Sequence, residues 1–193
     1  MTKLTNYYIR VGWVTIVLAA SIGPAIAQEN EAVIRVTLLG TGTPAVRAHR
    51  SGPATVVEAG GEVLLFDAGR GTTTQFGRAG IPLPSADMLF LTHLHSDHIT
   101  GVPDLLLTGW VAGRRDDPLR VWGPAGTQSM ITQLGEAYQY DIWLRSNAHT
   151  LDPPFPSLPA SGASVEVTEI TEGVVYSNNG VTVTAFDVDH SPI

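Results

Sequence analysis

A run of residue types that bind metals lies near the middle of the chain. Residues 93–98 read HLHSDH, so three of the six histidines and one aspartate fall within six positions. Imidazole nitrogens and carboxylate oxygens are ligands for zinc and similar divalent ions. In an extended segment His93 and His95 can turn toward one ion, while Asp97 and His98 point elsewhere, toward a second ion. The pattern therefore favours a metal site. In the alternative interpretation it is a solvated polar loop, with Asp97 capping the next helix.

The segment before this run is expected to be a buried strand. Residues 87–92 read DMLFLT, an apolar run of strand length. Such a strand places the histidines at its carboxyl end, where α/β folds keep their ligand sites. Further strands and helices alternate along the chain, so the predicted class is α/β, or mixed α+β. The expected strands span residues 33–39, 54–59, 63–66, 87–92, 119–122, 165–170, 174–177 and 181–188, and the expected helices span 72–78, 103–112 and 127–140.

The pattern H-x-H-x-D-H resembles the signature of the metallo-β-lactamase superfamily. Three flanking motifs are similar to those of its ribonuclease Z and arylsulfatase-like branch, and the resemblance extends from about residue 33 to residue 193. These motifs are LGTGTP at 39–44, FDAG at 66–69 and LRVWGPAGT at 119–127. The resemblance implies an αββα sandwich with a binuclear metal site at the edge of its two sheets.

The resemblance also implies a role for each residue of the run. His93 and His95 would bind the first metal ion, and His190 would complete that three-histidine set. Asp97 and His98 would bind the second ion, and Asp97 would also be the catalytic proton acceptor. Two zinc ions are the cofactor expected for the complete family site. Taken without the family, His190 is equally an ordinary surface histidine after an edge strand.

Asp67 resembles the carboxylate that braces the family's metal site by hydrogen bonding to the ligand loop. From its neighbours alone it is also interpretable as a turn residue at a strand end. The family's remaining ligands for the second ion, a bridging aspartate and a late histidine, come further along the chain than Ile193. We therefore expect an αββα sandwich that is incomplete at its C-terminus, with half of the second ligand set.

The N-terminus has the features of a secretory signal peptide. Residues 1–27 combine a basic start, an apolar run and the sequence Ala25-Ile26-Ala27, which fits cleavage after Ala27. The apolar run is shorter than the roughly 20 residues that a spanning helix needs, so we expect no stable membrane anchor. The predicted domains are a signal peptide at 1–27 and a hydrolase domain at 28–193, located in the periplasm or secreted.

The composition excludes cysteine-based sites and limits the partners that the sequence predicts. The chain contains no cysteine, which excludes disulfides, a cysteine nucleophile and thiolate-bound metals. Its net charge is −7, and after cleavage 9 arginines would face 18 acidic residues, which gives −9. Such a chain gains little from releasing counterions on nucleic acid, so a nucleic-acid partner is disfavoured.

Three functions follow as hypotheses. The preferred one is an exported, zinc-dependent hydrolase that uses a metal-activated water on a small-molecule ester, such as a phosphodiester or a sulfate ester. The first alternative is a ribonuclease Z-type endoribonuclease that processes the 3′ end of tRNA, which the flanking motifs favour. The second alternative is a truncated, catalytically defective fragment that binds metal. The resemblance allows a homodimer, and no substrate-binding residue is assigned.

Overall fold

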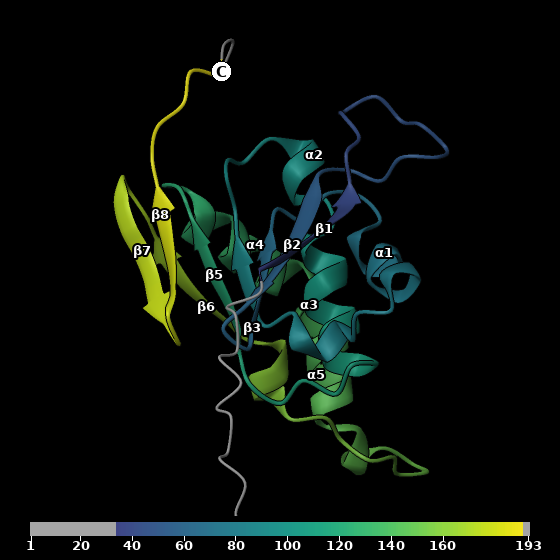
Figure 1. Cartoon of the computed structure of the whole chain (residues 1–193). Coiled ribbons are helices and arrows are strands. Elements are labelled where there is room, and N and C mark those ends of the chain that lie inside the picture. Colours follow the sequence, from purple (N-terminus) through teal and green to yellow (C-terminus); the bar gives the residue numbers. More distant parts are fainter. Residues whose placement is uncertain (1–33, 191–193) are drawn as a thin grey trace, which may run out of the picture. The chain divides into compact units, whose positions relative to one another are not determined.

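The structure, a computed structural model, describes residues 34–190, in which strands and helices alternate (Figure 1). The strands are β1 (Arg35–Gly40), β2 (Ala54–Ala59), β3 (Glu62–Phe66), β4 (Met88–Phe90), β5 (Leu119–Gly123), β6 (Val165–Glu169), β7 (Gly173–Asn178) and β8 (Val181–Ala185). The α-helices are α1 (Thr72–Ala79), α2 (Ser96–Ile99), α3 (Val102–Val111), α4 (Thr127–Ala137) and α5 (Gln139–Ser146). Short 3-10 helices are η1 (Leu83–Ser85), η2 (Ala148–Thr150) and η3 (Ala160–Ala163). The mixed α/β class predicted from the sequence is confirmed.

The predicted signal peptide at residues 1–27 lies outside the described residues. The cleavage site after Ala27 and the start of the domain at residue 28 therefore stay predictions. Within residues 34–190, no helix is both long enough and apolar enough to cross a membrane.

Six strands form one sheet in the order β1–β2–β3–β4–β5–β6. The first three pair antiparallel, and β2 turns into β3 at Gly60 and Gly61, whose φ angles are 57° and 81°. Glycine adopts such positive φ angles without a steric penalty, which explains why this hairpin could be predicted. From β3 to β6 the strands run parallel. Their carboxyl ends therefore meet at one edge of the sheet, beside Asp67 and residues 93–98.

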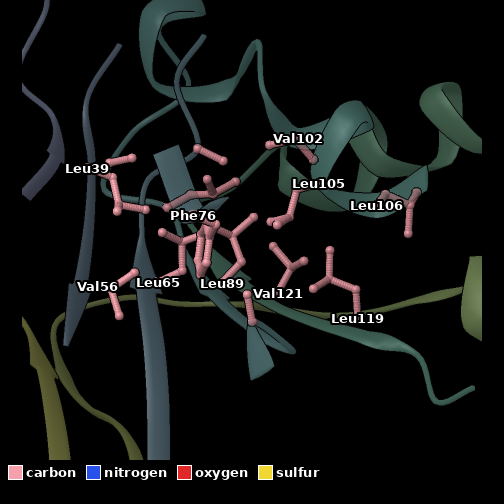
Figure 2. Packing of buried hydrophobic residues seen from close by; sticks show 14 of the residues in the cluster. Leu39, Val56, Leu65, Phe76, Leu89, Val102, Leu105, Leu106, Leu119 and Val121 are labelled. Atoms are coloured by element: carbon pink, nitrogen blue, oxygen red, sulfur yellow. The ribbon is translucent and has the colours of Figure 1, made fainter. Parts of the chain in front are cut away.

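Helices α1, α3 and α4 cover one face of this sheet. Phe76 of α1 and Leu105 of α3 are fully buried there against Leu65 and Leu89 of the sheet (Figure 2). Burying one such side chain stabilises the fold by about 1.5–3 kcal/mol. This apolar layer makes the sheet a firm base for the loops at its carboxyl edge.

The hairpin of β7 and β8 packs on the other face, away from α1 and α3 (Figure 1). Successive β4 side chains point to opposite faces, so Leu89 faces the helices while Met88 and Phe90 face the hairpin. The Phe90 ring stacks on that of Trp122 at 4.6 Å between centroids, and Tyr176 of β7 meets Phe90 edge-on at 5.9 Å. Residues 34–190 thus supply a helical layer, a central sheet and a hairpin of a second sheet, consistent with the predicted sandwich.

Three predicted elements differ in length from the structure by three residues or more. The strand expected over 87–92 is shorter, since β4 spans only Met88–Phe90. The helix expected over 127–140 is two helices, because α4 ends at Ala137 and α5 begins at Gln139, after Tyr138 leaves helical geometry (φ −102°, ψ 6°). The strand expected over 181–188 ends at Ala185, which pairs with the first residue of β7. The chain beyond Ala185 lacks a partner strand among the described residues and continues in a non-regular form toward His190.

Candidate metal centre

Two adjacent strand ends build the base of the site. Asp67 follows β3 and has a left-handed backbone (φ 60°), and its N–H donates to the carbonyl of Phe90 at 2.8 Å. One strand over, Leu91 donates to the carbonyl of Trp122 at 2.7 Å, which extends the pairing of β4 with β5 by one residue. The next residue, Thr92, therefore lies directly beside the Asp67 side chain.

Three histidines gather above this base. His93 and His95 come from the segment after β4, and His190 comes from the segment after β8. One ring nitrogen from each can be chosen so that all three lie within 4.8 Å of one another. The ring of His93 is 4.6 Å from that of His95 and 4.8 Å from that of His190, between centroids. The structure thus brings together the three residues predicted to form the first ligand set.

The surroundings of His93 fit a metal ligand. Its Nδ1 lies 3.0 Å from the Thr92 hydroxyl, whereas its Nε2 is buried and has no hydrogen-bond partner among the described residues. Burial, followed by the neighbouring imidazoles of His98 and His95, lowers the pKa of His93 below its ordinary value. A neutral imidazole with one free nitrogen is the form that coordinates a metal ion. An unpartnered, buried Nε2 therefore suits a cation that would satisfy it.

Asp97 and His98 form a second group of donors next to the first. Asp97 is buried in the first turn of α2, and its Oδ2 lies 3.9 Å from Nε2 of His98. The His98 ring is 4.0 Å from that of His93, between centroids. Two donor groups side by side are the arrangement that a two-metal site needs.

Asp67 lies beneath both groups. Its Oδ2 is 2.7 Å from Nδ1 of His98, and its Oδ1 accepts the backbone N–H of Thr92 at 2.9 Å. The Thr92 hydroxyl lies 3.0 Å from Oδ1 and 2.9 Å from Oδ2 of the same carboxylate. The structure therefore places Asp67 where a bracing carboxylate is expected, in contact with the segment that carries the histidines.

The backbone of α2 lies directly against the loop that carries Asp67. Ala68 donates to the carbonyl of His98 at 2.8 Å, and Gly101 donates to the carbonyl of Ala68 at 2.8 Å. A Cβ at Gly69 would collide with the carbonyl of Asp97, and a Cβ at Gly101 would collide with that of Gly69. Glycine at these two positions is what allows the close approach.

Sequence reasoning missed Thr92 and the packing role of Gly69 and Gly101. A threonine at the end of an apolar run is an ordinary strand residue, so its type carries no signal for a role in the site. Glycines between elements, such as Gly69 after β3 and Gly101 between α2 and α3, are more often turn residues than packing residues. Only the contacts of their backbone and side-chain atoms identify them.

Comparison with known proteins identifies close relatives. The chain is 44% identical over 165 residues to ribonuclease Z of Mycobacterium sp. (strain KMS), a match that covers 83% of this chain and 54% of the relative. It is 40% identical over 166 residues to ribonuclease Z of Mycolicibacterium gilvum (strain PYR-GCK), with the same coverage of 83% and 54%. The chain thus spans about half the length of the curated relatives that it matches.

A solved structure also matches. The crystal structure of human tRNase Z, short form, is 34% identical to this chain over an alignment that covers 55% of this chain and 40% of the human one, with a TM-score of 0.49.

These relatives correct two expectations from the sequence. The preferred hypothesis, an exported hydrolase of small-molecule esters, was wrong, because the relatives are ribonucleases Z. The expectation that nucleic acid is disfavoured was wrong for the same reason. It rested on the net charge of the whole chain, whereas phosphate binding depends on the local field, to which bound cations contribute strongly.

A family model settles the membership of the chain. The model of the metallo-beta-lactamase superfamily matches residues 48–183, a range that contains Asp67 and all of residues 93–98. The sheet, its covering helices and the packed hairpin agree with the sandwich that the sequence motifs implied. The chain therefore belongs to the metallo-β-lactamase superfamily.

Proposed function

We propose that this chain carries the metal site of a ribonuclease Z-type endoribonuclease, a metal-dependent hydrolase that cuts precursor tRNA at a phosphodiester bond. The observation that carries the proposal is the pair of donor groups, His93 with His95 and His190, and Asp97 with His98. The identity of 44% to a ribonuclease Z supports the choice of substrate.

The first group would hold one divalent ion and the second group would contribute to holding another. Zinc is the ion that we propose, because imidazole nitrogens and carboxylate oxygens suit it and no cysteine is present to favour a softer metal. Bound ions of this kind supply Lewis-acid stabilisation of negative charge and a water molecule of lowered pKa.

The chain's own residues prepare the donors for this task. Asp67 keeps a proton at Nδ1 of His98 through their 2.7 Å hydrogen bond, which leaves Nε2 of His98 free to coordinate. The buried carboxylate of Asp97 lies beside that Nε2 and is the group that we propose as both ligand and proton acceptor. His95 and His190 are exposed, so a phosphodiester can reach the open side of the three-histidine group.

Two measurements on the 193-residue chain test this proposal. Equilibrium dialysis against Zn²⁺ gives the number of ions bound, and a 5′-labelled precursor tRNA reports cleavage. We expect His93→Asn and His95→Asn to lose both metal and cleavage, whereas His149→Asn keeps both. His149 is the matched control because it is exposed and its Nδ1 bonds Ser157 at 2.7 Å, apart from the histidine group.

Each outcome has a defined meaning. Metal-dependent cleavage of the tRNA that is lost in the two site variants would support the proposal. A chain that binds two ions and leaves the tRNA intact would contradict the proposal that tRNA is the substrate. A chain that binds no metal would contradict the proposed metal site. A chromogenic phosphodiester, assayed beside the tRNA, separates two causes of intact tRNA: metal binding with hydrolysis of neither substrate would support the alternative of a defective, metal-binding protein.

A further inference from the structure

The Thr92 hydroxyl lies between a carboxylate and a histidine. Its oxygen is 3.0 Å and 2.9 Å from the two oxygens of Asp67, and 3.0 Å from Nδ1 of His93. All three distances are those of ordinary hydrogen bonds. The hydroxyl therefore connects Asp67 to His93, which has no hydrogen bond of its own to that carboxylate among the described residues.

Because the Thr92 hydroxyl carries a single proton, it can donate only one of these hydrogen bonds. A hydroxyl has one proton to donate and lone pairs to accept with. The Asp67 oxygens act as acceptors here, since Oδ1 already takes the backbone N–H of Thr92. The hydroxyl proton therefore belongs to the bond with Asp67, and the Thr92 oxygen accepts a proton from Nδ1 of His93.

A proton on Nδ1 leaves the lone pair of a neutral imidazole on Nε2. In His93 this Nε2 is the buried atom without a hydrogen-bond partner. Oδ2 of the same carboxylate, which the Thr92 hydroxyl also contacts, bonds Nδ1 of His98 directly at 2.7 Å. One carboxylate thus acts on a histidine in each of the two donor groups, directly on His98 and through a hydroxyl on His93.

We propose that Thr92 is a positioning residue that holds the proton of His93 on Nδ1 and so presents Nε2 to a metal ion. This inference rests on the proposed metal site. Outer hydrogen-bond partners of metal-binding histidines fix the ring orientation and the tautomer, and their loss weakens metal binding on the order of 10- to 100-fold. Thr92 fills this place for His93.

Three variants of the 193-residue chain test the role. Thr92→Val removes the hydroxyl at nearly constant volume, and Thr92→Ser restores a hydroxyl at the same position. Thr108→Val is the matched control, because it removes another threonine–carboxylate bond, the 2.7 Å bond to Asp104 in α3. Affinity for Co²⁺ is measured by competition with a chelating dye, and the absorption spectrum of bound Co²⁺ reports ligand geometry.

A second measurement does not depend on metal. Nitrogen-15 NMR of the metal-free chain, at a pH where histidines are neutral, distinguishes a proton on Nδ1 from one on Nε2. We expect His93 to carry its proton on Nδ1 in the wild type, in Thr92→Ser and in Thr108→Val. In Thr92→Val we expect a mixture of the two tautomers and Co²⁺ affinity lowered on the order of 10- to 100-fold.

Several results would overturn the proposal. A wild-type His93 with its proton on Nε2 would do so even if Thr92→Val fails to fold. Equal losses of affinity in Thr92→Ser and Thr92→Val would mean that shape, and not the hydroxyl, matters. A wild type that shows the Nδ1 tautomer and binds no Co²⁺ would leave the hydrogen-bond chain intact and refute the metal site itself.

Discussion

His190 lies 4.8 Å from His93 between ring centroids, although one follows β8 of the hairpin and the other follows β4 of the central sheet. The two residues are far apart along the chain and follow strands of different sheets. The packing of the hairpin against Phe90 and Trp122 sets their separation, so the three-histidine group depends on contacts between the two sheets.

Removing the central ring between the sheets should therefore weaken both the fold and the site. Phe90 is buried, and it stacks on Trp122 and meets Tyr176 edge-on. We expect Phe90→Ala to lower the free energy of unfolding by about 3–5 kcal/mol and to weaken Zn²⁺ binding as His190 loses its position. Urea unfolding and metal titration measure the two effects. Phe155→Ala, at an exposed phenylalanine, should change stability by less than about 0.5 kcal/mol. Intact metal affinity in a folded Phe90→Ala variant would contradict this dependence.

Asp67→Asn should weaken metal binding on the order of 10- to 100-fold. The amide keeps the size of the side chain, but it offers a single carbonyl oxygen where the carboxylate serves both His98 and Thr92. Leaving a buried polar group unpaired should also cost about 1–3 kcal/mol of stability. Competition with a chelator measures the first effect and urea unfolding the second. Asp141→Asn, in the exposed pair with Arg145, is the control that should change neither appreciably.

Gly69→Ala should destabilise the chain by about 1–3 kcal/mol or more, because the new Cβ meets the backbone of Asp97, which cannot move without shifting α2. Gly77→Ala in α1 is the matched control. A Cβ there meets nothing within 4 Å, so alanine should stabilise the helix by about 0.5–1 kcal/mol. Thermal unfolding of the metal-free chain compares the two variants. Opposite signs are expected, and equal shifts would show that Gly69 has no special packing role.

The free energy of unfolding of the metal-free chain should rise with pH between the lowered pKa of His93 in the folded chain and its ordinary value of 6.5. Burial lowers the pKa of His93 below its ordinary value of 6.5, so in this window the unfolded chain binds more protons than the folded one. Below pH 6.5 the unfolded chain gains stability from the proton on His93, which lowers the free energy of unfolding. This loss disappears once the pH exceeds 6.5. Urea unfolding at a series of pH values measures the slope. His93→Asn should show a smaller slope, and an unchanged slope would assign the effect to other groups.

Much of the fold could be predicted from local patterns. The Gly60-Gly61 hairpin and the buried strand before His93 follow from residue type and spacing over a few positions. Helix α5 could not be predicted in this way. Its boundary with α4 depends on one residue, Tyr138, and its apolar side chains Ile142 and Leu144 are only partly buried, so they give a weak pattern of helical spacing.

The sequence by itself determined which donors are present and that four of them, His93, His95, Asp97 and His98, fall within six positions. It also carried the motifs of the superfamily. The family resemblance implied that His190 joins this group and that Asp67 braces it, but the spacing of the residues did not. Tertiary structure brings His190 to the group, and it alone shows that Asp67 reaches His98 directly and His93 through Thr92. The reason is physical: spacing constrains only neighbours along a strand or turn, whereas the packing of two sheets and the pairing of parallel strands bring distant segments together.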